Sequence, residues 1–281
     1  MKWQGRRGSD NIEDRRRMSA GRAGGLGLGG MLAVLAIGYF LGIDVTPLLS
    51  GAPATSGGQT ADLTEADMAA GQFVSVTLAD TEEIWTDIFA RELGQTYTPA
   101  TLVLFKQATQ SPCGGATGAT GPFYCPLDKK AYLDTDFFTT LAQRMGAHGD
   151  FAAAYVVAHE IAHHVQNELG ILGEANKIRQ QSSQADSNAM SVRIELQADC
   201  FSGVWARHAG ERYASLEQGD IAEAMNAAKQ IGDDTLQRSA GQRPMPHTFT
   251  HGTSEQRQRW FAEGYKSGSI GACDTFSTQD L

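Results

Sequence analysis

Two histidines and a glutamate near the middle of the chain are spaced so that their side chains could act together on one face of a helix. His159, Glu160 and His163 lie within the stretch FAAAYVVAHEIAHHVQNELG, residues 151–170. The apolar residues around them predict a buried helix, on which the two histidines lie one turn apart on one face. Two imidazoles so placed can bind zinc, and the glutamate can take a proton from a water at the metal. The alternative is a core helix whose histidines only bond to neighbours; His164 faces elsewhere and is not expected to be a ligand.

A catalytic zinc usually has three protein ligands, so a third ligand must come from another element. Glu195 and Asp199 are four residues apart in a second apolar stretch, residues 189–208. Two like charges at that spacing destabilise a helix unless a cation lies nearby. We therefore expect Glu195 to be the third ligand and Asp199 to bond the outer nitrogen of a zinc-bound histidine. The alternative is an exposed face on which Arg193 or Arg207 pairs with both carboxylates.

Hydrolysis of an amide also needs a donor for the charge that develops on the carbonyl oxygen. His251, in the sequence THGT, is our candidate for this donor, followed by His247 and then by Arg257. Alternatively, His251 only caps or packs against the helix that follows.

Charge is unevenly distributed along the chain. Residues 1–23 hold seven basic and three acidic side chains, a net +4, which leaves −13 on the remainder of a chain whose total is −9. Because the body is acidic, we do not expect nucleic acid to be a partner.

The 18 residues from 26 to 43 carry no charge, which predicts a transmembrane helix over residues 24–43. A cleaved signal peptide ending near Ala52-Pro53-Ala54 is the alternative.

The positive-inside rule then predicts the order of segments. Residues 1–23 form a basic cytoplasmic arm, residues 44–60 are a flexible linker rich in Gly, Ser, Thr, Ala and Pro, and residues 61–281 form the folded domain. This corresponds to a single-pass protein of the cytoplasmic membrane with its catalytic domain on the periplasmic side.

An oxidising compartment favours disulfides. Cys113 and Cys125 flank a glycine-rich loop and are expected to pair; Cys200 and Cys273 are left to pair with each other or to stay as free buried thiols.

Hydrophobic spacing and helix caps predict a mostly helical domain with a small sheet. The expected helices span residues 80–93, 135–145, 151–170, 189–208, 220–231 and 255–264. Asp80 or Thr81 is expected to cap the first helix and Thr253 or Ser254 the last. The expected strands are residues 101–105 and two short pieces within 122–134, separated by a turn at Asp128-Lys129. A loop is expected at residues 111–122, and residues 180–188 are expected to be a loop or a solvated helix end.

Several long motifs resemble one known family, the neutral zinc metallopeptidases of bacterial membrane-anchored proteins. They are HEIAHHVQ and RIELQADCFSGVWA at the expected site, KWQGRRGSDNIEDRR near the start, GPFYCPLD, and THGTSEQRQRWF near the end. The resemblance implies a zincin fold of the gluzincin type. It also implies that His159, His163 and Glu195 bind zinc and that Glu160 is the catalytic base.

The sequence therefore predicts a zinc metallopeptidase that acts on a peptide or protein substrate. The substrate would lie antiparallel along an edge strand, supplied either by TLVLF (residues 101–105) or by the FYC segment (residues 123–125). Two alternatives stay open. One is an inactive membrane-tethered scaffold, whose closed zinc site would need His164, His247 or Cys200 as a fourth ligand. The other is a zinc hydrolase of a non-peptide amide.

Overall fold

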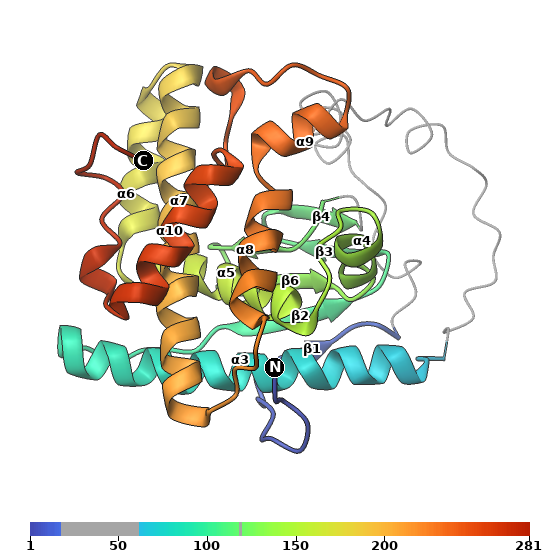
Figure 1. Cartoon of the computed structure of the whole chain (residues 1–281). Helices are drawn as coiled ribbons and strands as arrows, with labels where there is room; N and C mark the ends of the chain where they lie inside the picture. Colours follow the sequence, from blue (N-terminus) through green and yellow to red (C-terminus); the bar gives the residue numbers. More distant parts are fainter. Residues whose placement is uncertain (18–61, 118–119) are drawn as a thin grey trace.

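The computed structural model describes residues 1–17, 62–117 and 120–281 (Figure 1). A small sheet lies beside a group of packed helices, and the long helix α3 runs along one side of both (Figure 1). The fold is mixed α and β and mostly helical, as predicted. The helices are α3 (Glu65–Ile88), α4 (Phe137–Gln143), α5 (Asp150–Glu168), α6 (Ile171–Gln181), α7 (Gln184–Tyr213), α8 (Asp220–Gln230), α9 (Asp233–Ser239) and α10 (Ser254–Ser267), with short turns η2 (Phe89–Leu93), η3 (Pro246–Thr248) and η4 (Ile270–Ala272).

The main sheet has four strands in the order β1-β2-β6-β5. Its strands are β1 (Ile12–Asp14), β2 (Thr101–Phe105), β6 (Lys130–Asp134) and β5 (Phe123–Cys125). The first three run parallel, and β5 runs antiparallel to β6 at the edge. Because β2 is paired on both sides, the TLVLF segment cannot supply an edge for a substrate, and that alternative was wrong. The FYC segment is an edge strand.

The turn predicted at Asp128-Lys129 separates β5 from β6, and Lys129 has a positive φ of 56°. By contrast, the glycine-rich stretch expected to be a loop contains a hairpin. Strands β3 (Ala108–Ser111) and β4 (Gly114–Thr117) pair antiparallel there. The hairpin has few large apolar residues, so its hydrophobic pattern gave no signal.

Helix α3 begins fifteen residues before its predicted start. Thr64, not Asp80 or Thr81, is the N-cap, and it forms a capping box with Asp67. The buried face of the early turns includes Phe73, Val74 and Leu78. The expected end at Gly94 is confirmed, since Gly94 adopts a left-handed conformation there.

The other predicted helices are present with shifted ends. Of the two alternatives for residues 180–188, the solvated helix end is confirmed: α6 ends and α7 begins there, with a break at Ser182-Ser183 and Ser183 as the N-cap of α7. Helices α8 and α10 fall where expected, and Thr253 is the N-cap of α10 in a capping box with Gln256. Both disulfides are present, Cys113–Cys125 and Cys200–Cys273.

Residues 1–17 belong to the same folded unit as residues 62–281, rather than forming a separate arm. Strand β1 pairs with β2 in the main sheet. Trp3 packs edge-on against Phe73 of α3 with ring centroids 5.6 Å apart. Arg6 forms a bidentate ion pair with the buried Asp80 at 2.7 and 2.5 Å. Arg6 and Arg7 of this segment therefore pair with acidic groups of the body, which composition alone could not indicate.

The α-amino group of Met1, at the start of this segment, lies in a cluster of acidic side chains. It lies 2.8 Å from Asp150, 3.1 Å from Glu217 and 3.2 Å from Asp220.

The predicted transmembrane helix over 24–43 and linker over 44–60 lie outside the described residues. Among the described residues, no helix is both long enough and apolar enough to cross a membrane.

Candidate metal centre

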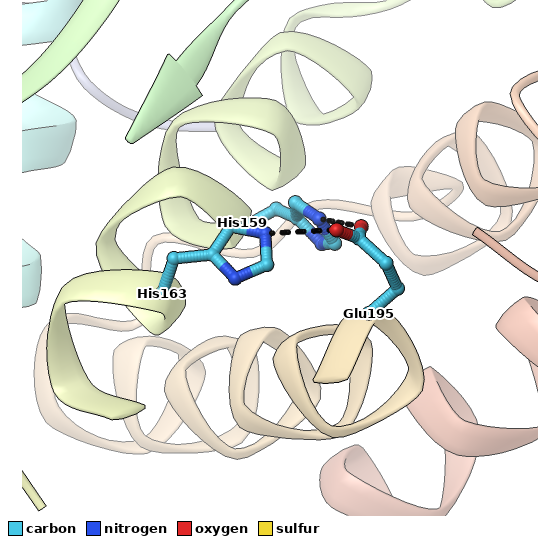
Figure 2. Close-up of side chains that lie close together, drawn as sticks. All are labelled: His159, His163 and Glu195. Atoms are coloured by element: carbon cyan, nitrogen blue, oxygen red, sulfur yellow. Dashed lines mark hydrogen bonds and ion pairs between the residues drawn. The ribbon is translucent and has the colours of Figure 1, made fainter. Parts of the chain in front are cut away.

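Helices α5 and α7 bring the three predicted ligands together (Figure 2). His159 Nε2 lies 3.1 Å from Glu195 Oε2, and His163 Nε2 lies 3.5 Å from Glu195 Oε1. One ligand atom from each of the three residues can be chosen so that these atoms all lie within 4.8 Å of one another. Figure 2 shows both rings pointing from α5 toward the carboxylate on α7.

These separations fit a zinc ion. Zinc bonds imidazole nitrogen and carboxylate oxygen at about 2.0–2.2 Å, so tetrahedral ligand atoms lie roughly 3.4 Å apart. The measured 3.1 and 3.5 Å lie close to that value. Two neutral nitrogens and one carboxylate match the donor set of a catalytic zinc site that keeps one open position.

Asp199 lies behind His159, as the sequence predicted. His159 Nδ1 is 2.9 Å from Asp199 Oδ1, although the ring is turned away from hydrogen-bond alignment. This contact directs Nε2 toward Glu195 and the metal position. Contacts of this kind hold a zinc ligand in one orientation and increase its basicity.

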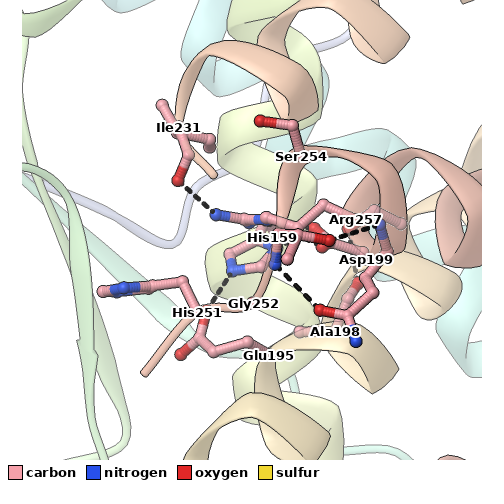
Figure 3. Close-up of polar contacts among 12 residues, drawn as sticks. His159, Glu195, Ala198, Asp199, Ile231, His251, Gly252, Ser254 and Arg257 are labelled. Atoms are coloured by element: carbon pink, nitrogen blue, oxygen red, sulfur yellow. Dashed lines mark hydrogen bonds and ion pairs between the residues drawn. The ribbon is translucent and has the colours of Figure 1, made fainter. Parts of the chain in front are cut away.

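Arg257 and Tyr155 both donate hydrogen bonds to the Asp199 carboxylate, and Figure 3 shows Arg257 beside Asp199. Arg257 donates from Nε to Oδ2 at 2.8 Å and from Nη2 to Oδ1 at 3.0 Å. Tyr155 donates from its hydroxyl to Oδ1 at 2.5 Å. All three side chains are buried. Arg257 was a candidate oxyanion donor, but its guanidinium instead donates hydrogen bonds to Asp199 and to the carbonyl of Ile231.

The alternative of an exposed pair with Arg193 or Arg207 was therefore wrong. Arg193 donates to the carbonyls of Thr275 and Thr278, and Arg207 pairs with Glu211. Tyr155 was not predicted as a partner of Asp199; the one available signal was that it lies four residues before His159 and shares its helix face.

His163 has a different supporting residue, which sequence reasoning missed. Its Nδ1 lies 2.9 Å from Oε1 of Gln166, which is fully buried in the next turn of α5. The signal was present in the spacing, because residues three apart on a helix share a face.

Glu160 is buried beside the two ligands, with 9% of its surface exposed. Among the described residues, its carboxylate has no hydrogen-bond or ion-pair partner. Burial raises the pKa of this carboxyl above its usual value, while the neighbouring histidines oppose the shift. A carboxylate without a partner and with a raised pKa can accept and return a proton.

The electrostatics of the ligands favour a cation. Burial alone would raise the pKa of Glu195, but His163 and His159 hold it well below its usual range. Burial alone would lower the pKa of His159, yet Asp199 and Glu195 raise it to about 9. Since metal ligands must be deprotonated, a bound cation would take the place of the proton on His159.

His251 is held by Asp233, a residue that sequence reasoning missed. Its Nδ1 lies 3.1 Å from Asp233 Oδ1. Asp233 Oδ2 also accepts the backbone N–H groups of Thr250, His251 and Gly252, so it orders the whole turn. Burial alone would lower the pKa of His251, but Asp233 and the more distant Glu195 raise it. Thr253, not His251, caps α10.

None of the three candidates for a fourth ligand is placed to close the site. His164 lies 3.0 Å from the Tyr124 hydroxyl and 2.7 Å from the carbonyl of Thr98, so it faces away as predicted. Cys200 is in a disulfide, and His247 lies exposed on η3. The only metal-competent cluster of described residues that includes His159 has three members.

Comparison with known proteins gives the following matches. A family model described as "Putative neutral zinc metallopeptidase" matches residues 1–276. Protein YpfJ of Escherichia coli K12, described as uncharacterized, is 44% identical over 286 residues, which cover 98% of this chain and 99% of the relative. Protein Rv2575 of Mycobacterium tuberculosis H37Rv, also described as uncharacterized, is 47% identical over 195 residues, covering 66% of this chain and 65% of the relative. No solved structure matches.

Proposed function

This chain belongs to the neutral zinc metallopeptidase family, and on that premise we propose that it is a zinc-dependent enzyme that hydrolyses peptide bonds. One observation carries the proposal. Two imidazoles from α5 and a carboxylate from α7 converge at separations that suit zinc, with the partnerless Glu160 beside them.

His159, His163 and Glu195 would hold the ion. When bound, zinc supplies Lewis acidity, which acidifies a water molecule and polarises the scissile carbonyl. Glu160 is the general base in this proposal: it accepts the proton of the attacking water and passes it to the leaving amine. Its raised pKa suits both halves of that transfer, because the proton must be taken and then released.

His251 is the proposed donor to the developing oxyanion. Asp233 holds the Nδ1 side of the ring, which leaves Nε2 to face the substrate. The raised pKa of His251 favours its protonated form, and a cationic donor is the stronger one for a negative oxygen.

We propose that the substrate binds in an extended form along β5. This strand is at the edge of the sheet, and it packs against α5, which carries the metal ligands. An edge strand presents unpaired backbone groups that can pair with an extended peptide.

The test uses zinc-loaded full chain and an unstructured protein substrate. Glu160→Gln should keep zinc and lose about 10²–10⁴-fold in cleavage rate. Glu174→Gln is the matched control, since that side chain is 73% exposed on α6 and should leave the rate unchanged. The proposal fails if zinc-loaded wild type cleaves nothing in a broad peptide library, or if Glu160→Gln cleaves as fast as wild type. Release of amine only from non-peptide amides would favour that alternative substrate class.

We also propose an extracytoplasmic location, supported by the two disulfides, because disulfides persist mainly in oxidising compartments. Membrane attachment through residues 24–43 stays a prediction from the sequence. Because β1 and β2 share one sheet, residues 1–17 must be on the same side of any membrane as the body whenever this fold is formed.

A further inference from the structure

We propose that two buried glutamines, Gln166 and Gln197, form an amide relay that orients the ring of His163 for the metal. The relay rests on the proposed function in one respect, namely that His163 binds zinc. Both glutamines are buried, with 0% and 5% of their surface exposed. The relay is independent of the Asp199 network, which supports the other histidine.

The relay consists of a continuous series of short contacts. Gln166 Oε1 lies 2.9 Å from His163 Nδ1, and Gln166 Nε2 donates to Gln197 Oε1 at 3.0 Å. Gln197 Nε2 in turn donates to the carbonyl of Cys273 at 3.0 Å. A second donation runs from Gln166 Nε2 to the carbonyl of Ile194 at 2.7 Å, next to the ligand Glu195.

Two backbone carbonyls fix the direction of every bond in this series. A carbonyl oxygen can only accept, so the amide nitrogen of Gln166 must face Ile194 and that of Gln197 must face Cys273. Gln166 Oε1 is therefore turned toward His163, where it can only accept as well. His163 must then carry its proton on Nδ1, which leaves Nε2 with a free lone pair on the side of Glu195.

The tautomer of His163 is thus set before any metal arrives. The ring is held in the orientation and the tautomer that present Nε2 to a divalent cation. Because each amide hydrogen of Gln166 already has an acceptor, rotating this amide by 180° would break both bonds and place Gln166 Oε1 against the oxygens of Ile194 and Gln197. The ligand is preorganised by neutral groups, which adds no charge to the site.

A disulfide anchors the far end of the relay. Cys273 is bonded to Cys200, which lies one turn after Gln197 on α7. The covalent link keeps the Cys273 carbonyl against the helix that carries Glu195. Loss of this disulfide frees the final acceptor, so we expect the metal site to weaken even though neither cysteine touches it.

The experiment measures the zinc dissociation constant of the metal-stripped full chain by competition with a chromophoric chelator. Gln166→Ala should weaken zinc binding by about 10–100-fold. Gln166→Glu keeps an acceptor for the Nδ1 proton but places its second oxygen against the Ile194 carbonyl and Gln197 Oε1, so it should not recover wild-type zinc binding. Gln181→Ala, at an exposed position on α6, is the matched control and should bind zinc as wild type does.

A spectroscopic readout separates positioning from packing. In ¹⁵N–¹H spectra of the histidine rings, His163 should show a hydrogen-bonded Nδ1–H in wild type that is shifted or lost in Gln166→Ala. The proposal is overturned if Gln166→Ala binds zinc within about twofold of wild type while only the melting temperature of the metal-free form falls.

A second set of variants keeps the test decisive if Gln166→Ala does not fold. Gln197→Ala should weaken zinc binding by roughly three- to tenfold. Replacing both Cys200 and Cys273 by Ala should act in the same direction, whereas replacing Cys113 and Cys125 removes a disulfide outside the relay and should not. Unchanged zinc binding in both relay variants would exclude the relay. If stripped wild type takes up no zinc, the metal site and the proposed function fail together, a result distinct from failure of the relay alone.

Discussion

Arg257 holds Asp199 by two parallel hydrogen bonds in the interior of the protein, from Nε at 2.8 Å and from Nη2 at 3.0 Å. Asp199 in turn lies 2.9 Å from Nδ1 of the ligand His159. The arginine on α10 therefore neutralises a buried charge on α7 that orients a ligand on α5. The three helices around the metal position are joined through one carboxylate.

Arg257→Met should disrupt both the fold and the site. Removing one partner of a buried ion pair leaves the other charge without compensation, so we expect a loss of about 3–5 kcal/mol in the free energy of unfolding. Zinc binding should weaken by about 10–100-fold, because Asp199 no longer holds His159. Denaturant unfolding and zinc competition measure the two effects. Arg259→Ala, which removes an exposed pair with Asp280, is the control and should change stability by less than about 0.5 kcal/mol. An equally small effect of Arg257→Met would contradict the account.

His251→Ala should reduce kcat/KM by about 10²–10³-fold without loss of zinc, as expected when one donor to an oxyanion is removed. His247→Ala is the matched control, because His247 is exposed four residues away and should leave the rate unchanged. Steady-state kinetics on zinc-loaded proteins measure the difference. Equal rates for wild type and His251→Ala would show that His251 only orders its loop with Asp233.

Arg6→Ala should destabilise the protein by about 3 kcal/mol at pH 8, since it leaves Asp80 buried without a counter-charge. Burial raises the pKa of Asp80 from 3.8 to about 6 even though Arg6 opposes the shift. A raised pKa means that stability is lost as pH rises through about 6, when the folded state must release this proton. Without Arg6, deprotonation of Asp80 costs more stability. The difference in the free energy of unfolding between Arg6→Ala and wild type should therefore be smaller at pH 5 than at pH 8.

Arg7→Ala provides the comparison for this experiment. Arg7 pairs with Glu83 on the surface, where the two side chains are 57% and 37% exposed, and its loss should cost less than about 0.5 kcal/mol at either pH. If both variants were equally stable at both pH values, residues 1–17 would not be part of the folded unit.

Residues 1–17 and the body should also be found in one compartment. Lys2 is exposed in this segment, and Lys177 is exposed on α6. The variants Lys2→Cys and Lys177→Cys should react equally with a membrane-impermeant maleimide in cells whose cytoplasmic membrane is intact, whether both react or neither does. Labelling at position 177 alone would indicate a single crossing between them, with β1 outside the sheet.

The metal ligands could be predicted from the sequence because their spacing reflects helix geometry. His159 and His163 repeat at four residues, as do Glu195 and Asp199, and each pair needs only its own helix to be recognised. The disulfide Cys113–Cys125 could be predicted for a similar reason, since its two cysteines flank one local loop. The zincin fold implied by the resemblance stays a prediction.

Partners far apart in the chain could not be predicted. Arg257 lies 58 residues after Asp199, and no local pattern separates it from Arg193 or Arg207, which also have suitable charge. Strand β1 was missed because it is only three residues long and lies in a basic segment. Its residues pair with residues of β2 that lie 90 positions later, such as Ile12 with Leu102, and pairing at that distance leaves no periodic pattern in the sequence.

X-ray absorption at the zinc edge tests the central claim most directly, using the full chain loaded with one equivalent of zinc. The account predicts one tightly bound ion with nitrogen and oxygen ligands at about 2.0–2.2 Å, no sulfur at about 2.3 Å, and loss of the ion in Glu195→Ala. Sulfur in the coordination shell, or zinc retained at full stoichiometry when His159, His163 and Glu195 are all replaced by Ala, would contradict it.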